Sequence, residues 1–472
     1  MNLQLPSAGA RRLPLTRLLV MSALLLFLPT MVQTGLAQSD DSALKVAAPV
    51  TAPAAASTLD TGDTAWILVA TALVLFMNIP GLALFYGGLV RTKNVLSVLM
   101  QCLALTALIS IIWLSFGYSL AFDTTGMVEG TVNLNSFIGG ISKSFLAGVT
   151  GDAIWGTIPE PLFFAFQMTF AIITPALIVG AFAERMKFSA MLWFSGIWLV
   201  VVYLPICHMT WGGSGGLFAD WGVFDFAGGI VVHITAGAAA LVACIVIGPR
   251  TGFPKSVMAP HSVTLTVVGT AMLWVGWFGF NAGSALKANG SAAMTLVATH
   301  ISAAAATLTW MGIEWFKTGK PSVLGAATGA IAGLAAVTPA SGFIGPLGGL
   351  GIGIASGVIC FWAATSLKNK FGYDDSLDVV GVHGVGGLVG TLLAAVFAAE
   401  MFGGTQGSDY SIAGQFKVQV GAALITTIYT LIASFVILKA VDATIGLRVS
   451  EQQELSGLDL ALHSEVGYNM ND

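Results

Sequence analysis

This sequence predicts an all-α protein that crosses a membrane many times, and three observations lead there. Hydrophobic residues make up 56% of the 472 residues and charged residues only 9%, whereas a soluble chain is about a quarter charged. Several apolar runs reach the ~18–20 residues that a spanning helix needs. Many of the 57 glycines stand four residues apart, as Gly329 and Gly333 do, which lets membrane helices approach closely.

The first 37 residues have the order of a secretory signal peptide. Arg11, Arg12 and Arg17 precede an apolar run that begins at Leu18, and Ala37 closes a small-residue cleavage site. An uncleaved signal anchor, which would add a twelfth span, is the alternative. Residues 38–62 are rich in Ala, Ser, Pro and Thr and are predicted to form a flexible periplasmic tail.

Eleven spans are predicted within a membrane domain of residues 63–440, followed by a cytoplasmic tail of residues 441–472. The spans cover approximately residues 64–88, 95–122, 159–182, 188–206, 226–247, 262–285, 292–313, 322–340, 342–366, 378–398 and 415–439.

Positive charges predict the orientation. Every loop after an odd-numbered span carries a pair of Lys or Arg residues, as does the segment after the last span, whereas the opposite loops hold only Lys143, Lys287 and Lys417. The positive-inside rule therefore places the mature N-terminus outside and the C-terminal tail inside.

Spans one to five and six to ten are predicted to be two inverted repeats, since five is odd, with an eleventh helix after them. The last span of each repeat carries a histidine, His233 about 12 Å from the outer end of its span and His383 about 8 Å from the inner end of its own. Both approach the middle of a ~30 Å core, where such repeats place substrate sites. Because ionisable residues inside spans are costly, we predict a facing pair in a pathway through the membrane.

An aspartate begins each histidine segment. Asp is a favoured N-cap, because its carboxylate satisfies free amides at the positive end of the helix. We interpret Asp378 as such a cap. For Asp225, a cap and a carboxylate whose field favours a nearby cation are equally supported, and both can hold together.

The other histidines are expected to have no role in a pathway. His208 is assigned to an outer loop, His261 to an inner loop, His463 to the tail, and His300 to packing within a span. The chain shows neither an HExxH motif nor metal-ligand spacing of Cys, so no enzyme activity, metal or cofactor is expected. One alternative is a membrane haem or metal protein that uses His233 and His383 as ligands.

Aromatic residues gather near the predicted outer side. Trp277 and Phe280 end the sixth span, where an interfacial belt is the alternative reading. Phe166 and Phe170 are one turn apart and share a helix face. The indole of Trp211 follows the fourth span and could hold a cation.

These residues together resemble the ammonium transporter family (Amt/Mep/Rh), closest to the bacterial Amt branch. The resemblance covers about residues 64–468. The segments on which the resemblance rests are Pro80 to Gly88, Ala183 to Arg185, Asp225 to His233, Gly276 to Ser284 and Asp378 to Gly387.

The resemblance implies an outer recruitment site, a phenyl gate and a twin-histidine pore. The matching residues are Trp211, Ser284, Phe166 and Asp225 for recruitment, Phe170 and Phe280 for the gate, and His233, His383 and Trp277 for the pore. Ammonium would lose its proton below the gate, ammonia would cross an apolar pore, and the histidines would relay the proton.

The resemblance also implies a homotrimer in the bacterial inner membrane, with one pore per subunit and methylammonium as a substrate analogue. The tail, including Gly457, Asp459 and His463, resembles the family's regulatory C-terminus, and PII-type signalling proteins bind the family's inner face. An ammonium sensor of the same fold is the alternative, and the tail shows no recognisable signalling domain after Tyr468. The glycine-rich run from Trp211 to Gly216 is slightly longer than expected.

Overall fold

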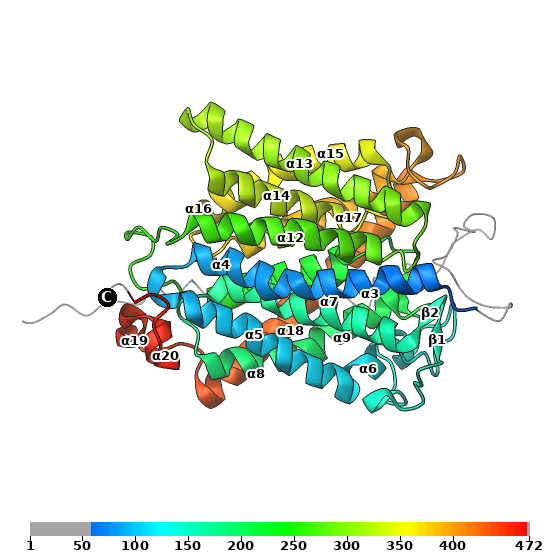
Figure 1. Ribbon diagram of the computed structural model, residues 1–472, viewed down its shortest axis with the longest axis horizontal. Coiled ribbons are helices and arrows are strands. Elements are labelled where there is room, and N and C mark those ends of the chain that lie inside the picture. The colour runs from blue at the N-terminus through cyan, green and yellow to red at the C-terminus, as the bar shows by residue number, and fades with distance from the viewer. Residues whose placement is uncertain (1–57, 470–472) are drawn as a thin grey trace, which may run out of the picture. The chain divides into compact units, whose positions relative to one another are not determined.

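The computed structural model describes residues 58–469, which belong to one compact unit, and apolar helices make up most of it (Figure 1). Ten helices among these residues are long and apolar enough to cross a membrane, and the shorter apolar helix α14 (Val323–Val337) stands at the place of the predicted eighth span. The predicted fold class with eleven spans is therefore confirmed. The predicted signal peptide and most of the predicted N-terminal tail lie outside the described residues.

Five spans form the first half, and three of them continue through a π-helical turn. In chain order they are α3 (Thr61–Phe76) continued into α4 (Ala83–Leu89), α5 (Val95–Ile112) continued into α6 (Tyr118–Phe122), α7 (Glu160–Phe182), α8 (Phe188–Trp198) continued into α9 (Leu204–Trp211), and the π-turn Gly229–Ile234 continued into α11 (Thr235–Ile247).

The second half has five spans, and α18 follows them. In chain order they are α12 (Val263–Gly283), α13 (Gly290–Thr318), α14, α15 (Pro346–Trp362) continued into α16 (Lys368–Phe371), the π-turn Val380–Gly384 continued into α17 (Val385–Phe397), and finally α18 (Ile412–Ile445).

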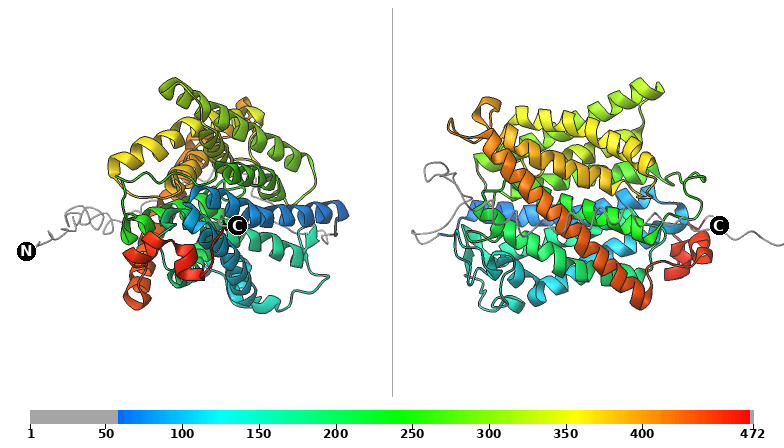
Figure 2. Two further views of the ribbon diagram at one scale, coloured as in Figure 1. Left: turned by 60° about the vertical axis from the view of Figure 1, so that its left-hand side comes forward. Right: turned by 180° about the vertical axis from the view of Figure 1, so that it is seen from behind.

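The contacts between helices repeat from one half to the other. The pairs α3–α7, α7–α11 and α5–α7 in the first half correspond to α12–α14, α14–α17 and α13–α14 in the second. Equivalent first spans also pack on each other, α3 against α12. Helix α18 lies diagonally across both halves, as the view from behind shows (Figure 2), and contacts α8, α11 and α17.

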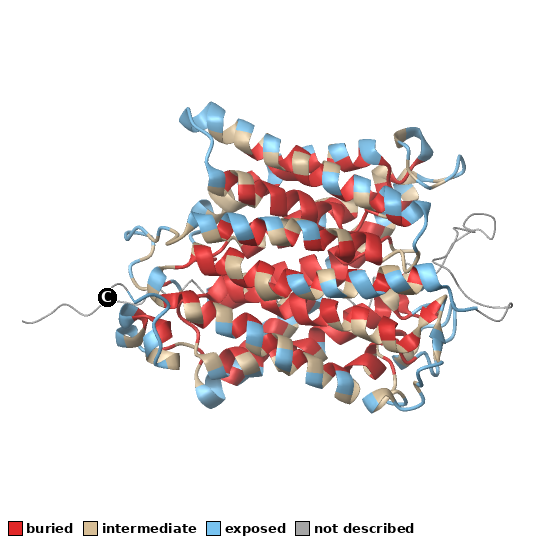
Figure 3. Ribbon diagram, viewed as in Figure 1, coloured by how far each residue is buried: buried red, intermediate tan, exposed pale blue. Residues whose placement is uncertain are grey.

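The bundle has two ends, which we name by what lies there. The short helices α19 (Glu451–Ser456) and α20 (Leu458–His463) mark the tail end, at the left of Figure 1. The antiparallel strands β1 (Ile154–Trp155) and β2 (Ile158–Pro159) mark the hairpin end. Between them the interior is buried, and stripes of exposed residues face outward (Figure 3). Large apolar side chains such as Leu308 and Val436 lie in these stripes, as expected for surfaces in contact with lipid.

Several span ends lie beyond the predicted ones, among them those of the seventh span, at Thr318, and the ninth, at Phe371. The fourth span continues five residues beyond the expected end, to Trp211. The π-helical turn Leu199–Tyr203 lies just before Pro205, and such a local adjustment lets a membrane helix continue through a residue that lacks an N–H. The assignment of His208 to an outer loop was therefore wrong. It is fully buried in α9 and its ring nitrogens lie 2.9 Å from the Ala121 carbonyl and 2.7 Å from that of Asn135. The last helix also continues past residue 440, to Ile445.

Candidate functional site

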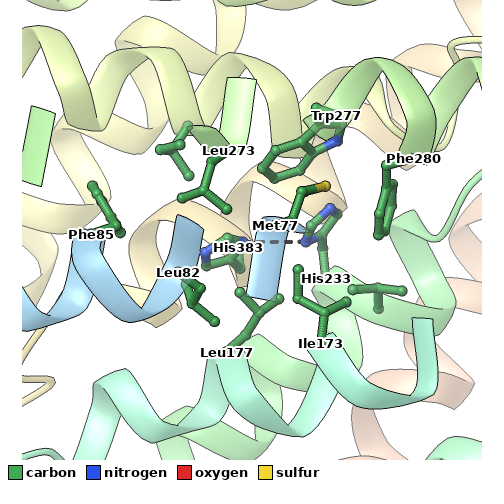
Figure 4. A pocket seen from close by; sticks show the side chains of 12 residues that line it. Met77, Leu82, Phe85, Ile173, Leu177, His233, Leu273, Trp277, Phe280 and His383 are labelled. Carbon is green, nitrogen blue, oxygen red and sulfur yellow. Dashed lines mark hydrogen bonds between the residues drawn. The ribbon is translucent and has the colours of Figure 1, made fainter. Parts of the chain in front are cut away.

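His233 and His383 face each other inside the bundle, between its two halves (Figure 4). Their Nδ1 atoms are 3.2 Å apart, so one donates its hydrogen to the other. The rings are nearly parallel, with an interplanar angle of 18°, and only 1% and 3% of the two residues is exposed. The Nε2 atom of His233 is buried and has no hydrogen-bond partner within residues 58–469. The predicted facing pair is thus what the structure contains.

Glycine lets the two histidine helices come this close. A Cβ atom on Gly237 would lie 2.1 Å from the Cα atom of Gly384, and one on Gly387 would lie 2.6 Å from the Cβ atom of His233. Real Cβ atoms do not approach other atoms so closely, and any side chain there would separate the helices.

Asp225 caps the helix that carries His233. Its carboxylate accepts hydrogen bonds from the backbone N–H groups of Gly228, Gly229, Ile230 and Val231. These are the amides that a helix leaves unpaired at its start. The residue is 4% exposed, so without this carboxylate the amides would be buried and unsatisfied.

In the second repeat the cap is Asp375, and the interpretation of Asp378 as the cap was wrong. The Asp375 carboxylate accepts a hydrogen bond of 2.8 Å from the Val380 N–H, whereas Asp378 forms an ion pair with Lys368. The signal that could have found Asp375 is its spacing. It stands eight residues before His383, as Asp225 stands before the first histidine.

A row of aromatic rings extends from the histidine pair toward the hairpin end of the bundle. Trp277 stacks on His233 with centroids 5.7 Å apart, and its indole N–H donates to the Thr338 hydroxyl over 2.9 Å. The rings of Phe170 and Phe280 follow, with centroids 4.3 Å apart. The ring of Trp211 is then nearly perpendicular to that of Phe170, with centroids 5.7 Å apart.

The other two predicted residues of the outer site differ in exposure. Ser284 is partly exposed, at the end of α12, and its hydroxyl donates to the Phe280 carbonyl over 2.8 Å. Phe166 has no exposed surface. It packs against Gly283 and lies 5.1 Å from Phe170, ring centre to ring centre, so it supports the Phe170 ring from behind.

Two cavities meet at His383. The first contains both imidazoles, and apart from these and Trp277 its lining is made of aliphatic, Met and Phe side chains. The second lies toward the tail end and is more polar, with Ser376, Asp378 and Thr328 in its wall. Phe85 and His383 line both cavities, so the two cavities are neighbours on either side of these side chains.

A buried charge network joins the loops at the tail end. Glu184 binds Arg91 and Arg250, each over 3.0 Å, and Arg250 also binds Asp374 over 2.8 Å. Burial alone would raise the pKa of Glu184, but the hydrogen bonds from Arg91 and the charge of Arg250 outweigh it and hold the pKa below its usual value. Four loops are thereby joined at the tail end.

The C-terminal segment is docked on this network. Arg448 pairs with Met186 as in a β-bridge, and its guanidinium binds Glu454 over 2.6 Å. The Asp459 carboxylate accepts hydrogen bonds from the N–H groups of Leu96 and Ser97 at the start of α5, over 3.0 and 2.7 Å.

The geometry of the histidine pair does not suit haem. Two nitrogens that ligate one iron from opposite sides stand about 4 Å apart, at about 2 Å per bond, which is farther than the 3.2 Å seen here. No group of three or more His, Cys, Asp or Glu residues within 58–469 could hold a metal ion.

Comparison with known proteins adds a family to this geometry. The model of the Ammonium Transporter Family matches residues 65–468. The ammonium transporter of Bacillus subtilis is 46% identical over 86% of this chain and 98% of its own, and that of Aquifex aeolicus is 45% identical over 87% and 94%. Among solved structures, Candida albicans Mep2 has a TM-score of 0.76 and 36% identity, over 84% of this chain and 88% of its own. A protein described as Sensor Amt Protein has a TM-score of 0.78 and 27% identity, over 85% and 98%. This chain is a multi-pass membrane protein and belongs to the ammonium transporter family.

Proposed function

We propose that this protein carries ammonium across the bacterial inner membrane by separating the ion into ammonia and a proton. Ammonium binds at the hairpin end beside Trp211 and Ser284, under the field of Asp225. It loses its proton near the Phe170 and Phe280 rings, which move apart to admit it. Ammonia then passes Trp277 and the histidine pair, and the two imidazoles relay the proton separately.

The observation that carries this proposal is the hydrogen-bonded histidine pair in an apolar cavity. A bare charge in the middle of a membrane costs at least ~2.5–3.5 kcal/mol, whereas neutral ammonia avoids most of this cost. Imidazole titrates near neutral pH and can take up and release the proton. The unpartnered Nε2 atom of His233 is available to the nitrogen that enters.

Potassium is excluded in this proposal by the same chemistry. A desolvated cation on the Trp211 indole gains about 2 kcal/mol, and potassium shares in that gain. It has no N–H to donate to the Ser284 hydroxyl, however, and no proton to give up. It would have to enter the apolar cavity as an ion.

The test is the transient current of purified protein in liposomes on a solid-supported membrane. We expect a current after an ammonium jump and none above that of protein-free liposomes after an equal potassium jump. Equal currents for the two ions, or none for ammonium, would contradict the proposal.

The membrane orientation and assembly are part of the proposal. The tail end, with its Lys and Arg pairs, faces the cytoplasm, and the docked C-terminal segment there offers a surface to a PII-type partner. A homotrimer is supported by His300. It is exposed about 15 Å into α13, where an imidazole facing lipid is costly and a second subunit would cover it. Native mass spectrometry tests the trimer.

An ammonium sensor is the second candidate, because one structural neighbour is described as a sensor. That neighbour is 27% identical, however, whereas the two transporters above are 45–46% identical. A sensor would bind ammonium with little sustained uptake, so uptake of labelled methylammonium by the reconstituted protein separates the two.

A further inference from the structure

We propose that Asp378 returns the proton to ammonia at the tail end of the pore. This inference rests on the proposed function and deepens it, since it names the group that completes the reaction on the side of release.

The first support is the cavity that Asp378 shares with His383. Both side chains line the second cavity, and His383 also lines the apolar cavity that holds the histidine pair. Ammonia that leaves the pair therefore enters a space with a carboxylate in its wall. A proton that leaves His383 enters the same space.

Asp378 does not cap the helix that begins beside it, and the one side-chain contact described for it is the ion pair with Lys368. The helix amide that it was expected to cap is bound by Asp375 instead. Asp378 also has a left-handed backbone, with φ of 60°, a conformation that is uncommon for residues other than glycine and that Asp and Asn adopt more readily than most.

The first repeat shows what this position requires for folding alone. Gly228 stands five residues before its histidine, as Asp378 does, and has φ of 116°. Glycine adopts such a backbone without steric cost. The second repeat places a carboxylate at the strained position, and such strain collects at functional sites.

Asp378 already binds the ammonium group of a lysine side chain, which resembles the proposed substrate. The Lys368 ammonium lies 2.6 Å from a carboxylate oxygen of Asp378, whose side chain is 36% exposed. A primary ammonium and the ammonium ion present the same N–H donors and the same charge. Lys368 thus shows that the carboxylate can bind an ammonium group, and the partly exposed Asp378 side chain also lines the second cavity.

The proposed step balances in protons. The His383 imidazolium gives its proton to the Asp378 carboxylate through water in the shared cavity, and the imidazole becomes neutral. The protonated carboxyl then gives this proton to ammonia, which leaves as ammonium, and the carboxylate is restored.

Three variants test this step in liposomes. Asp378→Asn removes the charge but keeps the shape, and Asn tolerates a left-handed backbone. Asp378→Gly reproduces the residue of the first repeat and relieves the strain. Lys368→Met breaks the same ion pair from its other side and is the matched control.

We expect both Asp378 variants to slow ammonium-evoked charge transfer about 100-fold or more. The melting temperature of Asp378→Gly should stay close to that of the wild type, because relief of the left-handed backbone offsets the loss of the ion pair. Lys368→Met should keep at least half of the wild-type rate. Wild-type rates in the Asp378 variants would overturn the inference, as would an equal loss in Lys368→Met, which would mean that the ion pair is structural. If the wild-type protein itself gives no ammonium current, the proposed function fails instead, which is a separate outcome.

Discussion

The indole N–H of Trp211 donates to the backbone carbonyl of Asp225 over 2.8 Å, while the carboxylate of Asp225 holds the start of the helix that carries His233. One residue therefore positions an aromatic ring at the hairpin end and an imidazole at the centre of the bundle. A substitution of Asp225 should therefore change the positions of both the Trp211 ring and the His233 imidazole.

The first prediction concerns Asp225→Asn. The amide keeps one oxygen that can accept hydrogen bonds, but its NH2 group cannot bind the two N–H groups that now meet the second oxygen. Leaving these buried amides unsatisfied should cost about 2–4 kcal/mol. We expect a lower melting temperature in detergent and a higher half-saturating ammonium concentration, measured from the current.

Asp375→Asn is the matched control, because Asp375 caps the corresponding helix of the second repeat but has no link to Trp211. Because the second oxygen of the Asp375 carboxylate has no hydrogen-bond partner among residues 58–469, Asn can keep the bond from the Val380 N–H. This variant should therefore lower the melting temperature less than Asp225→Asn does and leave the half-saturating concentration unchanged. If both variants change this concentration equally, Asp225 has no special part in recruitment.

Trp211→Leu tests the cation–π contact at the mouth. Loss of a desolvated contact of about 2 kcal/mol should raise the half-saturating ammonium concentration about 10- to 30-fold, with the maximal current much less affected. Trp211→Phe keeps a ring that binds cations less strongly, and its half-saturating concentration should lie between those of Trp211→Leu and the wild type. Equal affinity in all three proteins would contradict an aromatic recruitment site.

How far the sequence alone predicts this protein depends on whether a feature repeats along the chain. Span number, the two halves and the histidine pair follow from hydropathy and from a pattern that occurs twice. The cap of the second repeat was assigned to Asp378 because helix starts cannot be located to within three residues from hydropathy. The eight-residue spacing of Asp375 from His383 was the better guide.

Contacts between distant loops could not be predicted in this way. Glu184 lies 93 residues from Arg91 and 66 from Arg250 along the chain, and no local pattern pairs them. The same holds for His208, whose two partners are backbone carbonyls on other segments.

The Glu184 network predicts a pH dependence of stability. Its pKa is lowered in the folded protein, so its contribution is present above the unfolded pKa of about 4.3 and is lost as the pH falls through the folded value. We expect the melting temperature of the wild type to drop below about pH 4.3. Glu184→Gln removes one partner of a buried pair at a cost of about 3–5 kcal/mol, and its melting temperature should be lower at pH 7 and change less with acid. If the melting temperature falls equally with pH in the wild type and in Glu184→Gln, Glu184 is not the source of the pH dependence.

The relay is tested by replacing both histidines at once. His233 and His383 bind each other through their Nδ1 atoms, so a single substitution leaves the other nitrogen buried without this partner and costs about 1–3 kcal/mol. Replacing both by Leu removes the two polar groups together, which is nearly neutral for folding when the shapes are similar. The double variant should therefore keep its melting temperature within a few degrees, while the ammonium-evoked current disappears because no group in the apolar cavity can carry the proton. Uptake of labelled methylammonium, measured beside the current, shows whether neutral amine still passes. An undiminished current in the folded double variant would rule out the imidazoles as the proton path.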